Sequence, residues 1–510
     1  MKASPLLKKF LSCLILLVSI LNPAVASSKK ESFCRGKFTG RGAAKASSVP
    51  EPTKIHAVQT VAIMRGGTLP LTSDNRPSLN WPIFISFLYF LSVAITTAAL
   101  PAFCNTLFTA SGEDKVNRKG VNLHGLFSSV DQLFTFMFVG LWGSLSDKIG
   151  RKPMAAFSAA GLALGWLTVA FSNSIPVLLA GRAVDGITSC MLPLTQSMVR
   201  DISNINDLET NMGRLQGVSV GAAFIVGAMS GGILTKKLGP RFVFKIAAAI
   251  GLFATIIAAT VAPETLPSKR GIRTVKQTSM VSESASAGPI EAIKLLGRSR
   301  ISMGAAATFL LFWTGLNGLQ INLFNFAQHK FGWDKVQSTK LQAMSGVLLA
   351  ISNGLGPKLL LPRIGLINTV RLGMTGMAIC LACMAFVTSE AIFFAAVCGA
   401  SLCTVCLPVL LGTLAKEYPL DEGGASIAAL ETANTLNRVG AYRGAAWMFG
   451  WSIAEGRSKA LAGLFFAVGS SFVAFGAIIF EVVVAQHIRN SGLQKSYEIE
   501  AEKKAVEIKN

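Results

Sequence analysis

Residues 143–152 read GSLSDKIGRK and carry four charged side chains between two strongly apolar stretches. LFTFMFVGLW precedes this segment and PMAAFSAAGLALGWLTVAF follows it, with one glycine at its start and another directly before Arg151. Charged residues are costly inside a bilayer, whereas glycine permits a tight turn. The pattern therefore predicts a short water-exposed loop between two membrane-spanning helices.

The composition of the whole chain agrees with this interpretation. Only 15% of the 510 residues are charged, and the mean hydropathy is +0.52, whereas a soluble protein carries about 25% charged residues. A membrane-spanning helix needs about 20 mostly apolar residues. Twelve such stretches follow residue 80, at 82–105, 125–145, 154–172, 175–198, 215–235, 242–262, 301–327, 341–361, 372–388, 391–414, 425–453 and 460–485.

These stretches predict an all-α membrane protein with twelve transmembrane helices in two six-helix bundles, at 81–265 and 299–485. A Ser-, Gly- and Lys/Arg-rich linker at 266–298 joins the bundles, with a short surface helix expected around Glu291–Leu296. A polar tail follows at 486–510. A soluble fold would need a dozen helices that are apolar on every face, which excludes it.

The formal net charge of +22 does not indicate nucleic-acid binding, because the Lys and Arg residues fall in loops between apolar spans. Such a bias orients membrane helices, and it favours a topology with the N-terminus and the 266–298 linker on the cytoplasmic side. No phosphate-binding loop or catalytic constellation is present, and the four histidines form no ligand spacing, so we expect no enzyme, cofactor or metal. The Cys380–Cys383 and Cys403–Cys406 pairs have the spacing of zinc half-sites, but they lie in apolar helices and are interpreted as packing residues.

The N-terminus has the pattern of targeting signals. Residues 1–26 contain lysines, a short apolar core and Ala24-Val25-Ala26, which is typical of a signal peptide. Residues 27–80 are basic, hydroxyl-rich and poor in acids, like an organelle transit segment. Together they resemble the bipartite presequences of plastids enclosed by extra membranes. The alternative is a signal anchor followed by a disordered arm, with the protein in an endomembrane or the plasma membrane.

The opening loop resembles the signature loop between the second and third helices of the major facilitator superfamily. The matching residues are Gly143, Asp147, Gly150, Arg151 and Lys152. We expect Gly143 to allow close helix approach, Gly150 to adopt positive φ, and Asp147 to pair with Arg151. The resemblance implies that Asp147 also faces the positive end of the eleventh helix and holds the cytoplasmic gate shut.

Further motifs resemble this superfamily in the expected order. The fourth span contains Arg182 in the segment LLAGRAVDG, and the sixth span ends with APETLP. The segment after the eighth span, LGPKLLLPRIG, is similar to a degenerate second copy of the opening loop. The fifth span resembles the glycine-rich antiporter motif, through Gly221, Gly227, Gly231 and Gly232. The 154–265 region is most similar to the tetracycline and multidrug antiporters. It departs from them at Ala228, where a proline is usual, and in having no acid in the first span.

Three intramembrane charges are candidates for ion coupling. Arg182 and Asp185 are three residues apart, so their side chains can meet, either as a permanent structural pair or as a proton-coupling site. Asp131 lies about 24 Å along the second helix from Asp147. Its position predicts a residue near the outer mouth rather than at the centre.

A polar face on the seventh span is a candidate for the substrate cavity. Asn317, Gln320, Phe324 and Gln328 recur at helical spacing, and Trp313 lies one turn earlier. These side chains either face a solute-binding cavity or only tie helices together.

The sequence thus predicts a secondary active transporter of a small organic solute, with alternating access and proton antiport as one option. Facilitated diffusion or symport of a metabolite is the alternative within transport. A receptor or assembly protein on the same fold is the alternative outside it. The expected partners are a small-molecule substrate, protons and the lipid bilayer, and we expect a monomer.

Overall fold

The computed structural model describes residues 77–109, 115–203, 208–266, 289–416, 423–455, 457 and 459–490. The chain forms two units, Met1–Trp81 and Pro82–Asn510. Of the first unit only 77–81 are described, and they lead into helix α4. The predicted signal peptide and nearly all of the transit-like segment therefore lie outside the described residues.

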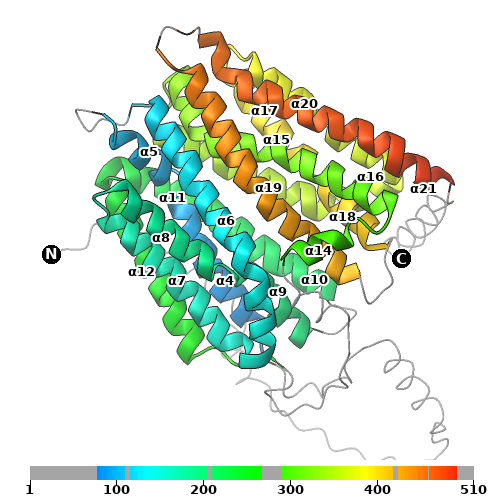
Figure 1. Ribbon diagram of the computed structural model, residues 1–510, viewed down its shortest axis with the longest axis horizontal. Helices are drawn as coiled ribbons and strands as arrows, with labels where there is room; N and C mark the ends of the chain where they lie inside the picture. Colours follow the sequence, from blue (N-terminus) through cyan, green and yellow to red (C-terminus); the bar gives the residue numbers. More distant parts are fainter. Residues whose placement is uncertain are drawn as a thin grey trace, which may run out of the picture. The chain divides into compact units, whose positions relative to one another are not determined.

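The second unit is built of helices in its described part (Figure 1). The N-terminal bundle comprises α4 (Asn80–Ile95), α5 (Ala99–Thr106), α6 (Arg118–Ile149), α7 (Arg151–Phe171), α8 (Ile175–Thr188), α9 (Met191–Ile202), α10 (Leu208–Arg214), η2 (Leu215–Ala222), α11 (Ala223–Leu238) and α12 (Pro240–Thr260). The C-terminal bundle comprises α15 (Arg300–Phe331), α16 (Lys335–Ala385), α17 (Glu390–Cys403), α18 (Cys406–Lys416), α19 (Gly423–Ser452), η4 (Lys459–Gly463), α20 (Leu464–Ile479), η5 (Phe480–Ala485) and α21 (Gln486–Asn490). Helix α14 (Pro289–Leu295) precedes α15, where a short linker helix was expected.

Each of the twelve predicted apolar stretches is helical. The first span is divided between α4 and α5 and the fourth between α8 and α9, while α16 contains the eighth and ninth spans on either side of Gly365. Among the described residues, nine helices are long and apolar enough to cross a bilayer by length and composition. Helix α15, the first part of α16 and α19 are not in that group, and α15 and α19 carry the buried amides described below.

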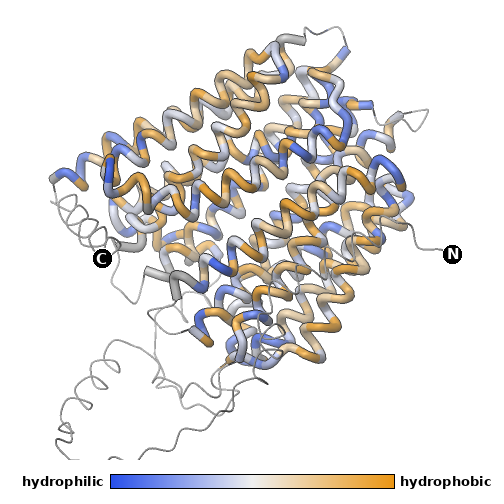
Figure 2. The backbone as a smooth tube through the Cα atoms, turned by 180° about the vertical axis from the view of Figure 1, so that it is seen from behind, coloured by the Kyte–Doolittle hydropathy of each residue, from blue (hydrophilic) through white to orange (hydrophobic). Residues whose placement is uncertain are grey.

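The distribution of polarity fits a bilayer environment. Figure 2 shows mostly apolar helices with hydrophilic residues concentrated near their ends. Large apolar side chains such as Leu252, Phe253 and Ile256 on α12 are about half exposed. An exposed apolar face of this kind is stable against lipid, which is as apolar as leucine.

Two helix pairs join the bundles. Helix α6 packs along α19 (Figure 1). Helix α11 packs along α16. Small residues bring the backbones together: a Cβ on Gly125 of α6 would collide with Ala446, and one on Gly232 of α11 would collide with Thr339. Close approach at glycine is a general device for packing membrane helices.

The glycines of the fifth span divide into packed and open positions. A Cβ at Gly227 would lie 2.6 Å from Cβ of Ala94, and one at Gly231 would collide with the carbonyl oxygen of Ile95. By contrast, a Cβ at Gly221 would meet nothing closer than 3.9 Å. The span is irregular at the π-helical segment η2, which precedes these packed glycines. This irregularity does not depend on a proline, since position 228 is Ala228, and π-helical turns often occur at functional positions.

Gly231→Ala should destabilise the protein strongly, because its Cβ would enter the backbone of α4. We expect a loss of about 1–3 kcal/mol or more, typical of overpacking. Gly221→Ala, in η2 of the same span, is the matched control and should change stability by less than about 0.5 kcal/mol. Thermal unfolding of the purified proteins in detergent measures both. Equal unfolding temperatures for the two variants would contradict the close α4–α11 contact.

Candidate functional site

The expectation of a loop at 143–152 is wrong for most of this stretch, because residues 143–149 continue α6 and Gly150 alone separates α6 from α7, which starts at Arg151. The turn at Gly150 is held by an acid that follows the sixth span. Gly150 has φ of +121°, as predicted, and a Cβ there would lie 2.5 Å from Oε2 of Glu264. The Glu264 carboxylate accepts hydrogen bonds from the backbone N–H groups of Arg151 (2.9 Å) and Lys152 (3.1 Å). These N–H groups begin α7 and have no partner within the helix, so the carboxylate caps a positive helix end.

Arg151 anchors the loop from inside the protein. Its guanidinium contacts Oδ1 of Asp147 at 2.7 Å and Oδ2 of Asp201 at 3.0 Å, and it donates to the Ser146 hydroxyl. The Arg151 side chain is 4% exposed and that of Asp201 10%, whereas Asp147 is 59% exposed. The predicted Asp147–Arg151 pair is therefore confirmed, but the buried partner is Asp201, at the end of α9.

Two other predictions for this loop fare differently. The expectation that Gly143 permits close helix approach is wrong, because a Cβ there would meet nothing within 4 Å. Gly143 lies on an exposed part of α6. The contact between Asp147 and the start of the eleventh helix stays a prediction, since the side chains at the beginning of α19 are outside the described set.

The second copy of the loop is visible in the backbone. Gly365 interrupts α16 with φ of +74°, at the place that corresponds to Gly150. Pro362 stands where the first copy has its acid. Six residues after Gly365, Arg371 contacts Glu481 at 2.5 Å. This pair is about 40% exposed. The C-terminal bundle thus keeps the turn but not the buried arginine.

A buried cluster of three charges joins α6 to α8. Arg182 of α8 contacts Oδ2 of Asp131 on α6 at 2.9 Å and Oδ2 of Asp185 at 2.5 Å. The predicted Arg182–Asp185 contact is confirmed. All three side chains are at most 14% exposed. Charges inside a membrane helix bundle require partners of opposite charge, and here the Arg182 guanidinium pairs with both carboxylates.

Asp131 is not the mouth residue that its spacing suggested. Helix α6 has 32 residues and begins at Arg118, so Asp131 lies about 20 Å along the helix from its start. Its partner Gln132 donates from Nε2 to Asp131 Oδ2 at 3.0 Å. Asp131 therefore belongs to the inner ion cluster, because the helix extends further outward than its apolar part indicated.

Aromatic rings enclose the Arg182 guanidinium. Its Cζ lies 5.0 Å from the Phe127 ring centroid and 4.8 Å from that of Trp166, distances typical of cation–π contact. Nε of Arg182 has no hydrogen-bond partner in the described part of the chain, nor has Nδ1 of buried His124. His124 lies two turns before Asp131 on α6, so the two share one helix face. His124 could not be singled out from the sequence, because one isolated histidine forms no motif.

A second cation lies at the seam between α15 and α19. The Cζ atom of Arg438 is 5.1 Å from the Trp313 ring centroid, and Asn437 donates to the Leu310 carbonyl at 3.1 Å. Asn317 and Asn434 are fully buried, and neither amide has a hydrogen-bond partner in the described regions. Each lies one helical turn from the Arg438–Trp313 contact. Buried amides without protein partners are rare and usually indicate water or ligand.

The predicted polar face of the seventh span divides between different environments. Trp313 and Asn317 lie at the seam just described, while Gln320 is exposed. Phe324 and Gln328 line small cavities at the far end of the bundles, away from the 143–152 loop. The face does not open onto a single cavity, because positions 317 and 328 lie about 16 Å apart along the helix.

Polar contacts hold the two bundles together at that far end. Nδ2 of Asn105 donates to Oδ1 of Asn325 at 3.0 Å, and Lys236 contacts Asp334 at 2.7 Å. Further along α6, near Asp131, the Ser129 hydroxyl donates to the Val439 carbonyl at 2.9 Å. Hydrogen bonds from Lys236 and from the Gln337 backbone hold the pKa of Asp334 below its usual range, so the carboxylate stays ionised at neutral pH. The bundles are therefore in contact at the end opposite the 143–152 loop.

Three of the four paired cysteines, Cys380, Cys403 and Cys406, pack against glycines of the facing helix, whereas Cys383 is exposed. A Cβ on Gly376 would lie 2.6 Å from Sγ of Cys403, and one on Gly399 would lie 3.0 Å from Sγ of Cys380. Each thiol therefore fills space left by a glycine on the facing helix, which agrees with the packing interpretation. No group of three or more His, Cys, Asp or Glu side chains suited to a metal ion occurs among the described residues.

Comparison with known proteins defines the family. The profile of the Major Facilitator Superfamily matches residues 82–441. Human "hippocampus abundant transcript-like protein 1" is 22% identical over 391 residues, which cover 75% of this chain and 72% of the relative. The class D tetracycline resistance protein of Salmonella ordonez is 34% identical over 127 residues, 25% of this chain and 32% of the relative. The structure of the human organic anion transporter MFSD10 (TETRAN) superimposes with a TM-score of 0.57 at 17% identity, covering 79% of this chain and all of that one.

The chain belongs to the major facilitator superfamily, and it is a multi-pass integral membrane protein that acts as a secondary transporter of small solutes. The similarity to tetracycline resistance proteins confirms the relationship that the 154–265 motifs indicated. That match spans only about a third of the bacterial protein's length.

Asp201→Asn should destabilise the protein more than Asp147→Asn. Asp201 is a buried partner of Arg151, so its loss should cost about 1.5–3 kcal/mol, as for a hydrogen bond to a charged group. Asp147 is mostly exposed, and an exposed pair contributes about 0–1 kcal/mol. The measurement is thermal unfolding of both variants in detergent. A larger loss for Asp147→Asn would show that Asp147, and not Asp201, anchors Arg151.

Proposed function

We propose that this protein exchanges protons for a small organic solute and that the Arg182 cluster carries the proton. The supporting observation is the excess of buried carboxylates, since Arg182 contacts both Asp131 and Asp185. With both acids ionised the cluster has a net charge of −1, and an uncompensated charge in the bilayer is costly. One proton makes the cluster neutral.

Protonation also changes a contact between helices. Arg182 and Asp185 both belong to α8, whereas Asp131 belongs to α6, so the Arg182–Asp131 contact joins two elements. Protonation of Asp131 weakens that contact and leaves Arg182 with Asp185. Because α6 also packs along α19 of the other bundle, a change at Asp131 reaches the interface that alternating access must open and close.

The solute-binding site in this proposal is the α15–α19 seam. This seam offers a cation, the Arg438 guanidinium, and an aromatic surface, the Trp313 ring. It also offers the side-chain amides of Asn317 and Asn434, which have no hydrogen-bond partner among the described residues. These groups suit an organic solute that combines an apolar body with an anionic or electron-rich group. The name of the structural relative MFSD10, an organic anion transporter, supports the same substrate class.

Facilitated diffusion or symport remains the alternative mechanism, favoured by the absence of an acid in the described first span, 80–106. In that case the Arg182 cluster is a permanent structural tie. Transport measurements that separate exchange from pH-driven flux distinguish the two mechanisms.

The test compares Asp185→Asn and Asp131→Asn with wild type in proteoliposomes, with tetracycline and p-aminohippurate as probes. Proton coupling predicts that solute exchange without a pH gradient survives in both variants, while pH-driven accumulation falls at least tenfold in one or both. Glu431→Gln, an exposed acid on α19, is the control and should keep both activities. Wild-type accumulation in both aspartate variants would exclude the cluster as the proton carrier.

A further inference from the structure

The end of the bundles opposite the Gly150 turn is closed by a buried pair of amides, one from each bundle. Nδ2 of Asn105 on α5 donates to Oδ1 of Asn325 on α15 at 3.0 Å. Asn105 is fully buried, and Asn325 is 1% exposed. The Lys236–Asp334 ion pair at the same end differs, because its side chains are 59% and 41% exposed. The amide pair therefore joins the bundles away from water.

This pair uses only half of its polar atoms. Oδ1 of Asn105 and Nδ2 of Asn325 have no hydrogen-bond partner in the described part of the chain. A buried amide atom without a partner loses its full hydration, whereas a hydrogen bond between amides only replaces bonds to water. Closure of this end therefore takes both amides out of water and returns one hydrogen bond.

The Asn105 side of the pair is held within its own bundle. A Cβ at Gly120 of α6 would collide with the backbone and with Oδ1 of Asn105, so α6 presses directly against this residue. The Asn105 carbonyl accepts from Nδ2 of Asn117 and from Oγ1 of Thr109, each at 2.9 Å. The approach of the other bundle therefore decides whether Asn105 meets Asn325.

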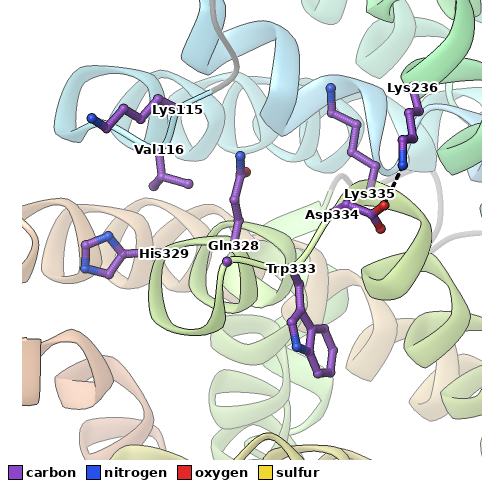
Figure 3. A pocket seen from close by; sticks show the side chains of 9 residues that line it. Lys115, Val116, Lys236, Gln328, His329, Trp333, Asp334 and Lys335 are labelled. Atoms are coloured by element: carbon purple, nitrogen blue, oxygen red, sulfur yellow. Dashed lines mark hydrogen bonds and ion pairs between the residues drawn. The ribbon is translucent and has the colours of Figure 1, made fainter.

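The surroundings of the pair favour closure on one side and hydration on the other. A pocket of only about 10 Å³ beside Asn325 is lined on the side of the first span by three apolar residues, Ala98, Pro101 and Ala102. One turn after Asn325, Gln328 lines a larger cavity of about 520 Å³ (Figure 3). A cavity of that size has room for water close to the pair.

We propose that Asn105 and Asn325 form a releasable latch, which closes this end of the transporter but leaves the closed state close in free energy to the open one. The hydrogen bond and the apolar neighbours favour closure, while the two unpartnered atoms oppose it. Alternating access requires each end to open in turn, which a stronger seal would prevent. The latch belongs to this cycle and does not depend on proton coupling at Arg182.

Opening of this end is measured with a cysteine at Ser338, which lines the small pocket beside Asn325 and is 2% exposed. Ser338→Cys keeps the size and shape of the side chain. The full-length protein in nanodiscs is labelled with a water-soluble maleimide, without solute or pH gradient. Peptide mass spectrometry gives the labelling rate at position 338. Native Cys406, which is fully buried in the C-terminal bundle, stays unlabelled as long as the protein is folded.

The decisive comparison is a double-mutant cycle of Asn105→Leu and Asn325→Leu in the Ser338→Cys background. Leucine keeps the branched shape of asparagine but cannot form the bond. Each single variant strands the remaining amide, whereas the double variant strands neither. We expect labelling of the double variant to be slower than the product of the two single effects by about five- to thirtyfold, the range for one buried amide left unpaired.

Asn325→Asp should have the opposite effect. At about pH 8 the new carboxylate is ionised, and it loses more on leaving water than the amide does. The closed state should become less populated, and labelling at position 338 should rise about three- to tenfold.

Asn322→Leu is the matched control, because Asn322 is fully buried on the same helix but faces its own bundle. One turn before it Gly318 approaches Ala445 of α19, and one turn after it Phe326 contacts Phe466 of α20. This variant should label like Ser338→Cys alone. Strictly multiplicative leucine effects, slower labelling of Asn325→Asp, or a change in Asn322→Leu as large as that of the double variant would each refute the latch.

Discussion

The arrangement of the N-terminal bundle depends on one buried cation, Arg182. A guanidinium in a membrane helix cannot shed its charge, so it must be paired and shielded. Two carboxylates supply the pairing and the Phe127 and Trp166 rings supply the shielding. This requirement brings α6 and α8 together, and α6 in turn forms the long contact with α19 of the other bundle.

The two bundles share a backbone plan but differ in how they anchor it. Gly150 and Gly365 both turn the chain with positive φ before the third helix of their bundle. Glu264 caps the helix that follows the first turn through backbone N–H groups, whereas the acid Glu481 of the last helix pairs with Arg371, six residues beyond Gly365. Arg151 is buried whereas Arg371 is about 40% exposed. The turn at Gly150 is therefore held more tightly than the turn at Gly365. A rigid turn of this kind suits a bundle that moves as one body against the other.

The features that could be predicted from the sequence are those that depend on the spacing of residues along the chain. The twelve apolar stretches are helices, Gly150 has positive φ, and the i,i+3 and i,i+4 pairs at Arg182–Asp185 and Asp147–Arg151 are formed. Each of these depends on residues within one or two helical turns. A single sequence contains such information directly.

Long-range partners could not be predicted in the same way. Asp131 with Arg182, Asp201 with Arg151, and Arg438 with Trp313 each join residues about 50 or more positions apart. Which helix faces meet decides these contacts, and hydrophobic periodicity is uninformative for helices that are apolar on most sides. Gly143 illustrates the converse, because its motif indicated close packing but its surroundings are open.

The central claim is that the Arg182 cluster holds one exchangeable proton, and infrared difference spectroscopy tests it most directly. Spectra of the protein in lipid are recorded across a pH titration in H₂O and D₂O, for wild type and for Asp131→Asn and Asp185→Asn. The account predicts a carboxylic C=O band in wild type that disappears as the pH rises, shifts in D₂O, and is absent from at least one of the two variants. A band of unchanged intensity in both variants, or none in wild type at any pH, would contradict it.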